Sequence, residues 1–490
     1  MNKTVTEFFN HNHNHAQNRF AVIPTVLRLR ADEQLTGRGV TIAILDSGFY
    51  PHADLTMPVN RILAFHDVSG LENTLDEHQT VKGYHWHGTQ TSVVAAGNGF
   101  LSNGQYRGLA SEANVVLIKA SDEKGRITEE NIACGIDWVV ENRERYRIRI
   151  LSISLGGDQN LMWSKSIVDQ SAERAVQEGI VVVVAAGNSG FDDSQPPIPP
   201  ANSPSVITVG GYDDENRLGS DVISLYHSNY GVTADGIVKP EIIAPAAWVA
   251  TPILPDTPSY KLAEVLSELY DAPDYLLPNL LMKYSEEIEL PAYLLMETPN
   301  LIRAEIESRL RENKIVATHY QHGDGTSFAT PIVASLVAQM LEANPRLTPA
   351  AVKQILIATA DRLSHAPAIR QGFGMVNAAR AVAEAGKEHH ELTHTEFGPP
   401  RVMNGLFLFT YHNDTACKVS LVGDFNDWHK SLNPFMKTEN GLWRAMLPRL
   451  STGNYRYKFL VDDKLWIEDP GNGLKESDGF SGFNSLLHVM

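Results

Sequence analysis

Four residues of this chain carry side chains that together could perform nucleophilic acyl transfer. Ser327 lies in the small-residue turn Gly323–Pro331, just before an apolar helical pattern, where backbone N–H groups and the helix dipole favour an anionic oxygen. Acyl transfer by a serine also needs an imidazole that takes its proton, a carboxylate that orients the imidazole, and donors for the oxyanion. His87, Asp46 and Asn188 are the candidates for these three roles.

Each of the four residues also has a structural interpretation that involves no chemistry. Ser327 could cap the N-terminus of the helix, and Asp46 could cap the end of a strand. His87 could cap the helix that starts near it, and Asn188 could form a turn. Taken singly these interpretations are favoured, but together they require four independent coincidences. The sequence therefore favours one catalytic site.

Short continuous apolar runs predict the strands that must position these side chains. One run begins at Gly39 and ends at Asp46, which is typical of a buried parallel strand. Similar runs cover residues 115–120, 150–157, 181–188 and 205–211. Helical patterns lie between several of them, so we expect an α/β fold with a parallel sheet and helices on both faces. Ligands of such sheets bind at the carboxyl ends of the strands, where the candidate residues are expected.

The helix after the turn is predicted from the apolar spacing within residues 331–345. Pro331 is expected in its first turn, where a missing backbone N–H costs little. Ser327 is therefore expected at the N-terminus of this helix.

Composition excludes several classes of protein. The net charge of −17 argues against binding to nucleic acids or to anionic membranes, and no apolar run is long enough to span a bilayer. The two cysteines, Cys134 and Cys417, form no disulfide framework, and the N-terminus has no signal-peptide pattern. We expect a cytoplasmic protein, or a secreted one if the numbering starts at a processed N-terminus. The histidines of residues 11–15 are interpreted as part of a disordered tail.

A chain of 490 residues is too long for one core, and its pattern changes along the sequence. Between residues 253 and 321 two amphipathic helices and several prolines predict a helical insertion. Residues 386–400 are polar and end in a proline pair, as in a linker, and residues 401–490 alternate as the short strands of a β-sandwich do. The remaining parts are an N-terminal extension, 1–35, and a main domain, 36–252 and 322–385.

Six motifs in the main domain are AILDSGFYPHADL, HGTQTS, SISLGG, VVVVAAGNSG, VKPEIIAP and GTSFATP, and in this order they resemble those of subtilisin-like serine peptidases. The resemblance implies a triad of Asp46, His87 and Ser327, with Asn188 and the N–H of Ser327 as the oxyanion hole. It further implies a set of residues that pair with the substrate backbone and wall its pocket: Ser154, Leu155, Gly156, Gly157, Ala185, Ala186 and Gly187.

The chain departs from the pattern of this family in two places. Gly-Thr-Gln follows His87 where the family often has a second histidine, and the expected pocket floor, residues 194–205, is rich in proline. The chemistry implied by the resemblance requires no cofactor. Calcium is common in the family, and the loop of residues 98–108 is either a structural calcium site or a plain solvated loop.

The sandwich region contains VSLVGDFNDW and FNSLLHV, and it resembles the glycogen- and starch-binding modules of the isoamylase and AMP-kinase β-subunit type. Aromatic faces in such modules stack on sugar rings. The resemblance implies that Trp428, Lys458, Trp466 and Asn484 bind α-glucan. Two alternatives stay open, namely that the tryptophans belong to the sandwich core and that the module docks a partner.

These observations favour a serine endopeptidase that acts on polypeptides, with a module for α-glucan or a partner. The main alternative is a scaffold or binding protein built on an impaired peptidase fold, and a carbohydrate hydrolase is disfavoured because no sugar-cleaving barrel is visible. The insertion enters directly before the nucleophile turn. It is therefore either a lid over the site or a decoration on the flank of the sheet.

Overall fold

The computed structural model describes most of the chain. The described residues are 21–71, 74–75, 80–157, 161–191, 195–219, 223–284, 286–387, 398–403, 406–437, 441–448, 450–480 and 482–489. The histidine tract at 11–15 and most of the expected linker at 386–400 lie outside them.

A parallel sheet forms the centre of the main domain, as the apolar runs predict. Its strands lie in the order β10 (Ile242–Pro245), β6 (Ile207–Asp213), β5 (Val181–Ala185), β4 (Ile148–Ile153), β1 (Thr41–Asp46), β3 (Asn114–Lys119) and β2 (Ile62–Asp67). All of these strands pair in parallel, and β7 (Ser224–Leu225) adds an antiparallel edge to β6. Every residue of β1 is buried, because helices cover both faces of the sheet.

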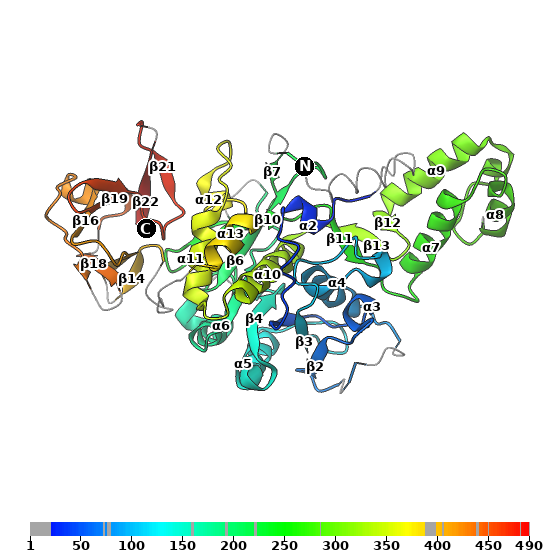
Figure 1. The fold of residues 1–490 in the computed structure, drawn as a ribbon, viewed down its shortest axis with the longest axis horizontal. Helices are drawn as coiled ribbons and strands as arrows, with labels where there is room; N and C mark the ends of the chain where they lie inside the picture. Colours follow the sequence, from blue (N-terminus) through cyan, green and yellow to red (C-terminus); the bar gives the residue numbers. More distant parts are fainter. Residues whose placement is uncertain are drawn as a thin grey trace.

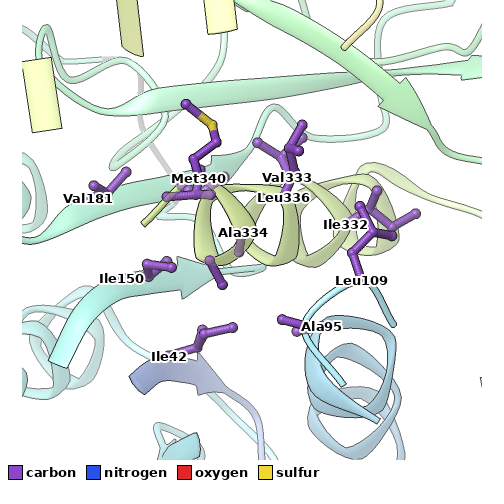
Figure 2. Close-up of a cluster of buried hydrophobic side chains, with 14 of the residues drawn as sticks. Ile42, Ala95, Leu109, Ile150, Val181, Ile332, Val333, Ala334, Leu336 and Met340 are labelled. Carbon is purple, nitrogen blue, oxygen red and sulfur yellow. The ribbon is translucent and has the colours of Figure 1, made fainter. Parts of the chain in front are cut away.

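Helices pack on each face of this sheet. One face carries α4 (His85–Ala96), α10 (Thr326–Ala343), α11 (Pro349–Thr359) and α13 (Ala378–Ala385), and the other carries α5 (Glu129–Tyr146) and α6 (Ile167–Gln177). Alternate residues of β1 serve the two cores, with Ile42 in one and Ala43 in the other. Nearly all of α10 is buried, and Figure 2 shows its apolar side chains facing those of β1, β4 and β5. This packing fixes the N-terminus of α10 at the sheet.

The insertion forms an arm with its own core. It contains α7 (Pro258–Asp271), α8 (Leu277–Tyr284), η4 (Ala292–Met296) and α9 (Pro299–Glu312). At its root, β13 (Tyr320–Gly323) pairs antiparallel with β11 (Val249–Pro252) and β12 (Ile315–Ala317). The helices project from the main domain on the side opposite the C-terminal sheets (Figure 1). Because β13 ends at Gly323, the root of the arm lies directly before the turn that carries Ser327.

Two antiparallel sheets pack face to face in the C-terminal region. One contains β14 (Arg401–Met403), β15 (Leu406–His412), β18 (Leu442–Pro448) and β17 (Met436–Lys437); the other contains β16 (Val419–Gly423), β19 (Gly453–Val461), β22 (Phe483–Val489), β21 (Lys475–Ser477) and β20 (Leu465–Ile467). An aromatic core that includes Phe409, Tyr457 and Phe459 lies between them. This is the β-sandwich that the alternating pattern predicts.

Short elements complete the described chain. They are α2 (Thr25–Arg28), α3 (Ala53–Thr56), η1 (Phe100–Ser102), η2 (Trp163–Lys165), α12 (Ala368–Gln371), η5 (Asp424–Asn426), β8 (Gly231–Val232) and β9 (Val238–Lys239). Within the described ranges, no helix combines the length and the apolarity that crossing a bilayer requires.

Candidate active site

Asp46 and His87 meet at the carboxyl edge of the sheet. Asp46 is the last residue of β1 and is fully buried, and its Oδ1 lies 2.7 Å from Nδ1 of His87. The backbone N–H of Ser47 donates to Oδ1, and the hydroxyl of Thr91 donates to Oδ2 at 2.9 Å. These donors fix the plane of the carboxylate, which in turn fixes the plane of the imidazole.

A glycine allows the helix of His87 to approach β1 closely. His87 is the third residue of α4, and Gly88 follows it against the strand end. A Cβ at position 88 would lie 2.2 Å from the carbonyl oxygen of Gly48 and 3.0 Å from Cβ of Asp46. Any other residue would therefore push His87 away from its carboxylate.

The carboxylate of Asp46 also raises the pKa of the His87 imidazole. Burial lowers the pKa of His87, but the charge of Asp46 and its hydrogen bond outweigh burial, so the pKa lies above its ordinary value of 6.5. A neutral His87 that donates from Nδ1 to Asp46 presents Nε2 as an acceptor. This is the state that a general base requires.

Ser327 occupies the second position of α10, as the sequence predicts. The N-cap is Gly325, so the interpretation of Ser327 as a helix cap is wrong. The ring of the next residue, Phe328, lies 6.2 Å from the imidazole of His87 between centroids, which places the first turn of α10 beside that imidazole. Ser327 is half-buried at this edge of the sheet.

Asn188 follows β5 and is hydrogen-bonded to Thr326, the first residue of α10. Its side-chain oxygen accepts hydrogen bonds from the backbone N–H and the hydroxyl of Thr326, each at 2.9 Å. Because these donors engage the oxygen, the amide nitrogen is directed elsewhere. A Cβ at Gly325 would lie 3.7 Å from this nitrogen and 3.7 Å from the backbone nitrogen of Ser327. The two nitrogens therefore lie on the same side of Gly325, whose φ of +146° favours glycine at this position.

The segments after β4 and β5 differ in how they border the site. A hollow of about 800 Å³ beside His87 is lined by Ser154, Leu155 and Gly156, and Tyr84 and Trp86 also line it. Gly157, Ala185, Ala186 and Gly187 do not line it. Instead, Gly157 donates to the carbonyl of Pro199, which packs the proline-rich segment against the wall of the hollow.

Sequence reasoning did not find two of the supporting side chains. Thr91 lies four residues after His87 on α4, and this helical spacing was the available signal for its contact with Asp46. Thr326 adjoins the nucleophile candidate, but its bond to Asn188 joins residues 138 apart in sequence. No local pattern indicates such a contact.

The loop of residues 98–108, considered above for calcium, contacts a carboxylate whose two oxygens already accept hydrogen bonds. Asp54 contacts this loop: its Oδ1 accepts from the N–H of Leu101, and its Oδ2 accepts from the hydroxyl of Tyr320 at 2.7 Å. In the described part of the chain, no three His, Cys, Asp or Glu side chains form a group that could hold a metal.

The four residues considered for glucan lie on the outer face of one sandwich sheet. The rings of Trp428 and Trp466 are 6.4 Å apart between centroids, and Trp466 is 39% exposed, so neither ring belongs to the core that Trp443 occupies. Strands β19 and β22 pair Tyr457, a core residue, with Ser485. Lys458 and Asn484 adjoin this pair in the two antiparallel strands, so they are neighbours on the face that points away from the core. Nζ of Lys458 is paired with Asp478 at 2.6 Å.

Comparisons with known proteins match both parts of the chain. Residues 37–375 match the model of the subtilase family, and residues 396–472 match carbohydrate-binding module 48, the isoamylase N-terminal domain. Serine protease AprX of Bacillus subtilis is 34% identical over 361 residues, which cover 72% of this chain and 68% of that protein. Minor extracellular protease Epr of the same organism is 27% identical over 219 residues, or 41% of this chain and 30% of that protein.

A solved structure supports the fold. Fervidolysin from Fervidobacterium pennivorans, a keratinolytic enzyme related to subtilisin, aligns with a TM-score of 0.50 at 18% identity. The alignment covers 87% of this chain and 53% of that one.

Proposed function

The chain belongs to the subtilase family and is a subtilisin-like serine peptidase, and from this premise we propose that it hydrolyses peptide bonds through Asp46, His87 and Ser327. The contact of 2.7 Å between Asp46 and His87 beside the first turn of α10 carries the proposal. The order of the three residues along the chain, Asp, His and then Ser, is that of the family.

The roles follow from the geometry of the edge. Nε2 of His87 takes the proton of Ser327 as its Oγ attacks the carbonyl carbon of the substrate, and Asp46 stabilises the imidazolium that forms. The side-chain amide of Asn188 and the N–H of Ser327 donate to the oxyanion. His87 then gives its proton to the leaving amine, and a water molecule attacks the acyl-enzyme with the same base. The hollow beside Ser154, Leu155 and Gly156 supports binding of the substrate as an added strand.

The oxyanion role of Asn188 predicts a loss in the chemical step alone. We expect Asn188→Ala to lower kcat by about 10²- to 10³-fold, because one donor to the developing charge is removed, while KM changes by less than about threefold. Steady-state kinetics on a peptide substrate measure both constants. Asn142→Ala is the matched control, since this amide on α5 donates within its own helix. An unchanged kcat in Asn188→Ala would remove Asn188 from the oxyanion hole.

For the C-terminal module we propose binding of α-glucan on the face of Trp428, Lys458, Trp466 and Asn484. The exposed indole of Trp466 beside that of Trp428 supports stacking on sugar rings. On this proposal the module brings the peptidase to polypeptides associated with glycogen or starch. Docking of a protein partner on the same face is the alternative, and it predicts no retention on glycogen.

Removal of both indoles is expected to abolish retention on glucan. Trp428→Ala/Trp466→Ala loses both aromatic faces on which sugar rings would stack. We expect the wild-type chain to be delayed in native electrophoresis through glycogen and the double variant to migrate as in a plain gel. Trp138→Ala, on α5 of the main domain, serves as the control. A wild-type chain that glycogen does not delay would contradict the glucan proposal.

A further inference from the structure

A proline interrupts the hydrogen bonds of α10 close to the nucleophile. The helix begins at Thr326, so Pro331 is its sixth residue, and the expectation that Pro331 lies in the first turn is wrong. A residue at this position normally donates its N–H to the carbonyl four residues earlier, which here is the carbonyl of Ser327. Proline has no N–H to donate, and its ring crowds that carbonyl.

A serine from another part of the chain donates to this carbonyl instead. Ser154 directly follows β4, is 9% exposed, and its Oγ donates to the carbonyl oxygen of Ser327 at 2.9 Å. A buried carbonyl without a donor is costly, so the hydroxyl satisfies a group that the helix cannot. The bond also joins the end of β4 to the first turn of α10.

We propose that the hydroxyl of Ser154 is a positioning residue for Ser327, in a role separate from any contact of its backbone with substrate. This inference rests on the proposed function. The carbonyl of Ser327 belongs to the peptide plane that leaves this residue, so holding the carbonyl limits rotation about the Cα–C bond. It thereby holds Cβ, which carries Oγ, in place relative to the end of β4. A nucleophile that is displaced by about 1 Å loses up to about 10² in rate, which makes one hydrogen bond at this place consequential.

The bond also couples the wall of the substrate hollow to the nucleophile. Ser154, Leu155 and Gly156 form one wall, and the hydroxyl of the first of them holds Ser327. A peptide that binds against this wall is therefore held in a defined position relative to Oγ of Ser327. This hydrogen bond of 2.9 Å therefore joins the wall directly to the residue that carries the attacking oxygen.

A double-mutant cycle with Pro331→Ala tests the proposal. An alanine at 331 restores the N–H that can donate to the carbonyl of Ser327, and it suits a helix better than proline does. We expect Ser154→Ala to lower kcat about 10-fold in the Pro331 background with KM within about twofold. In the Pro331→Ala background the same change is expected to lower kcat by less than about twofold. Equal losses in both backgrounds, or no loss in either, would overturn the proposal.

Thermal unfolding separates this proposal from the proposed function. The cycle is repeated in a Ser327→Ala chain, where the backbone carbonyl remains but no acyl transfer is possible. We expect Ser154→Ala to lower the Tm by about 2–4 °C with Pro331 present and by less than about 1 °C with Pro331→Ala. A wild-type chain without peptidase activity would contradict the proposed function. The Tm values of the Ser327→Ala chains would still test whether Ser154 donates to the carbonyl of Ser327. Equal shifts in Tm in both backgrounds would overturn the contact itself.

Discussion

Replacement of Ser327 by alanine is expected to abolish hydrolysis of both casein and peptides. The change removes the nucleophile while Asp46, His87 and Asn188 keep their hydrogen bonds, so binding of substrate persists without the acyl-enzyme. The expected loss is on the order of 10⁶ in kcat, a magnitude known for subtilisin itself and transferred here to a member of its family. Labelling of the chain by a fluorophosphonate is expected to disappear in parallel, because that reagent also requires the attacking oxygen.

Ser335→Ala is the matched control for this experiment. Ser335 lies on the same helix, is fully buried, and donates within that helix, to the carbonyl of Ile332. Its removal is expected to leave kcat unchanged. Hydrolysis that survives in Ser327→Ala would show that another residue is the nucleophile. A folded wild-type chain that neither hydrolyses peptides nor takes the label would instead favour the alternative of a scaffold on a peptidase fold.

Replacement of Asp46 by asparagine is expected to lower kcat by about 10⁴-fold. The amide of asparagine can donate to Nδ1 of His87, which would place the proton on Nε2 and leave no acceptor toward Ser327. The change also removes the charge that stabilises the imidazolium. In this orientation the N–H of Ser47 loses its acceptor, but the side-chain oxygen still accepts from Thr91. Because the side chains have the same shape, the fold is expected to persist.

Asp46→Asn is also expected to shift the pH profile of kcat/KM to lower pH. In the wild type the pKa of His87 is raised by Asp46 against the effect of burial, so kcat/KM is expected to rise with pH through a midpoint above 6.5. Asp46→Asn removes the raising charge and leaves burial, which lowers the pKa. The residual activity should therefore rise through a midpoint at lower pH than in the wild type.

The measurement is kcat/KM between about pH 5 and pH 9 for the wild type, Asp46→Asn and Asp137→Asn. Asp137 is a partly exposed residue of α5 that pairs with Arg174, and the profile of Asp137→Asn is expected to match that of the wild type. A midpoint that stays in place in Asp46→Asn would mean that the acidic limb reports a group other than His87.

The sequence by itself determined the architecture and the chemical types at the site. Continuous apolar runs that end in polar residues predicted β1, β4 and β5 as parallel strands, because a strand buried on both faces has no place for alternating polar residues. Such strands all expose their carboxyl ends at one edge. Asp46 and the segments that begin at Ser154 and Ala185 were therefore predictable neighbours before any contact was known.

Some outcomes depended on how separate elements pack. The sequence placed Pro331 in a first turn, but the packed helix begins at Thr326 and so puts the proline opposite the carbonyl of Ser327. Likewise, the pattern left open which tryptophans fill the sandwich core, and the structure buries Trp443 while Trp466 stays partly exposed. Where a helix starts and which face of a strand is buried depend on how complete elements pack against one another. A short window of sequence carries no information about that packing.

Only the tertiary structure decided the contacts that hold the reacting groups. The bond from Ser154 to Ser327 spans 173 residues, and the bond from Thr326 to Asn188 spans 138. Periodicity and turn chemistry act over a few residues, so they fix which side chains arrive at the edge of the sheet. The orientation of each side chain there depends on distances of about 3 Å between elements that meet only when the sheet and α10 have packed.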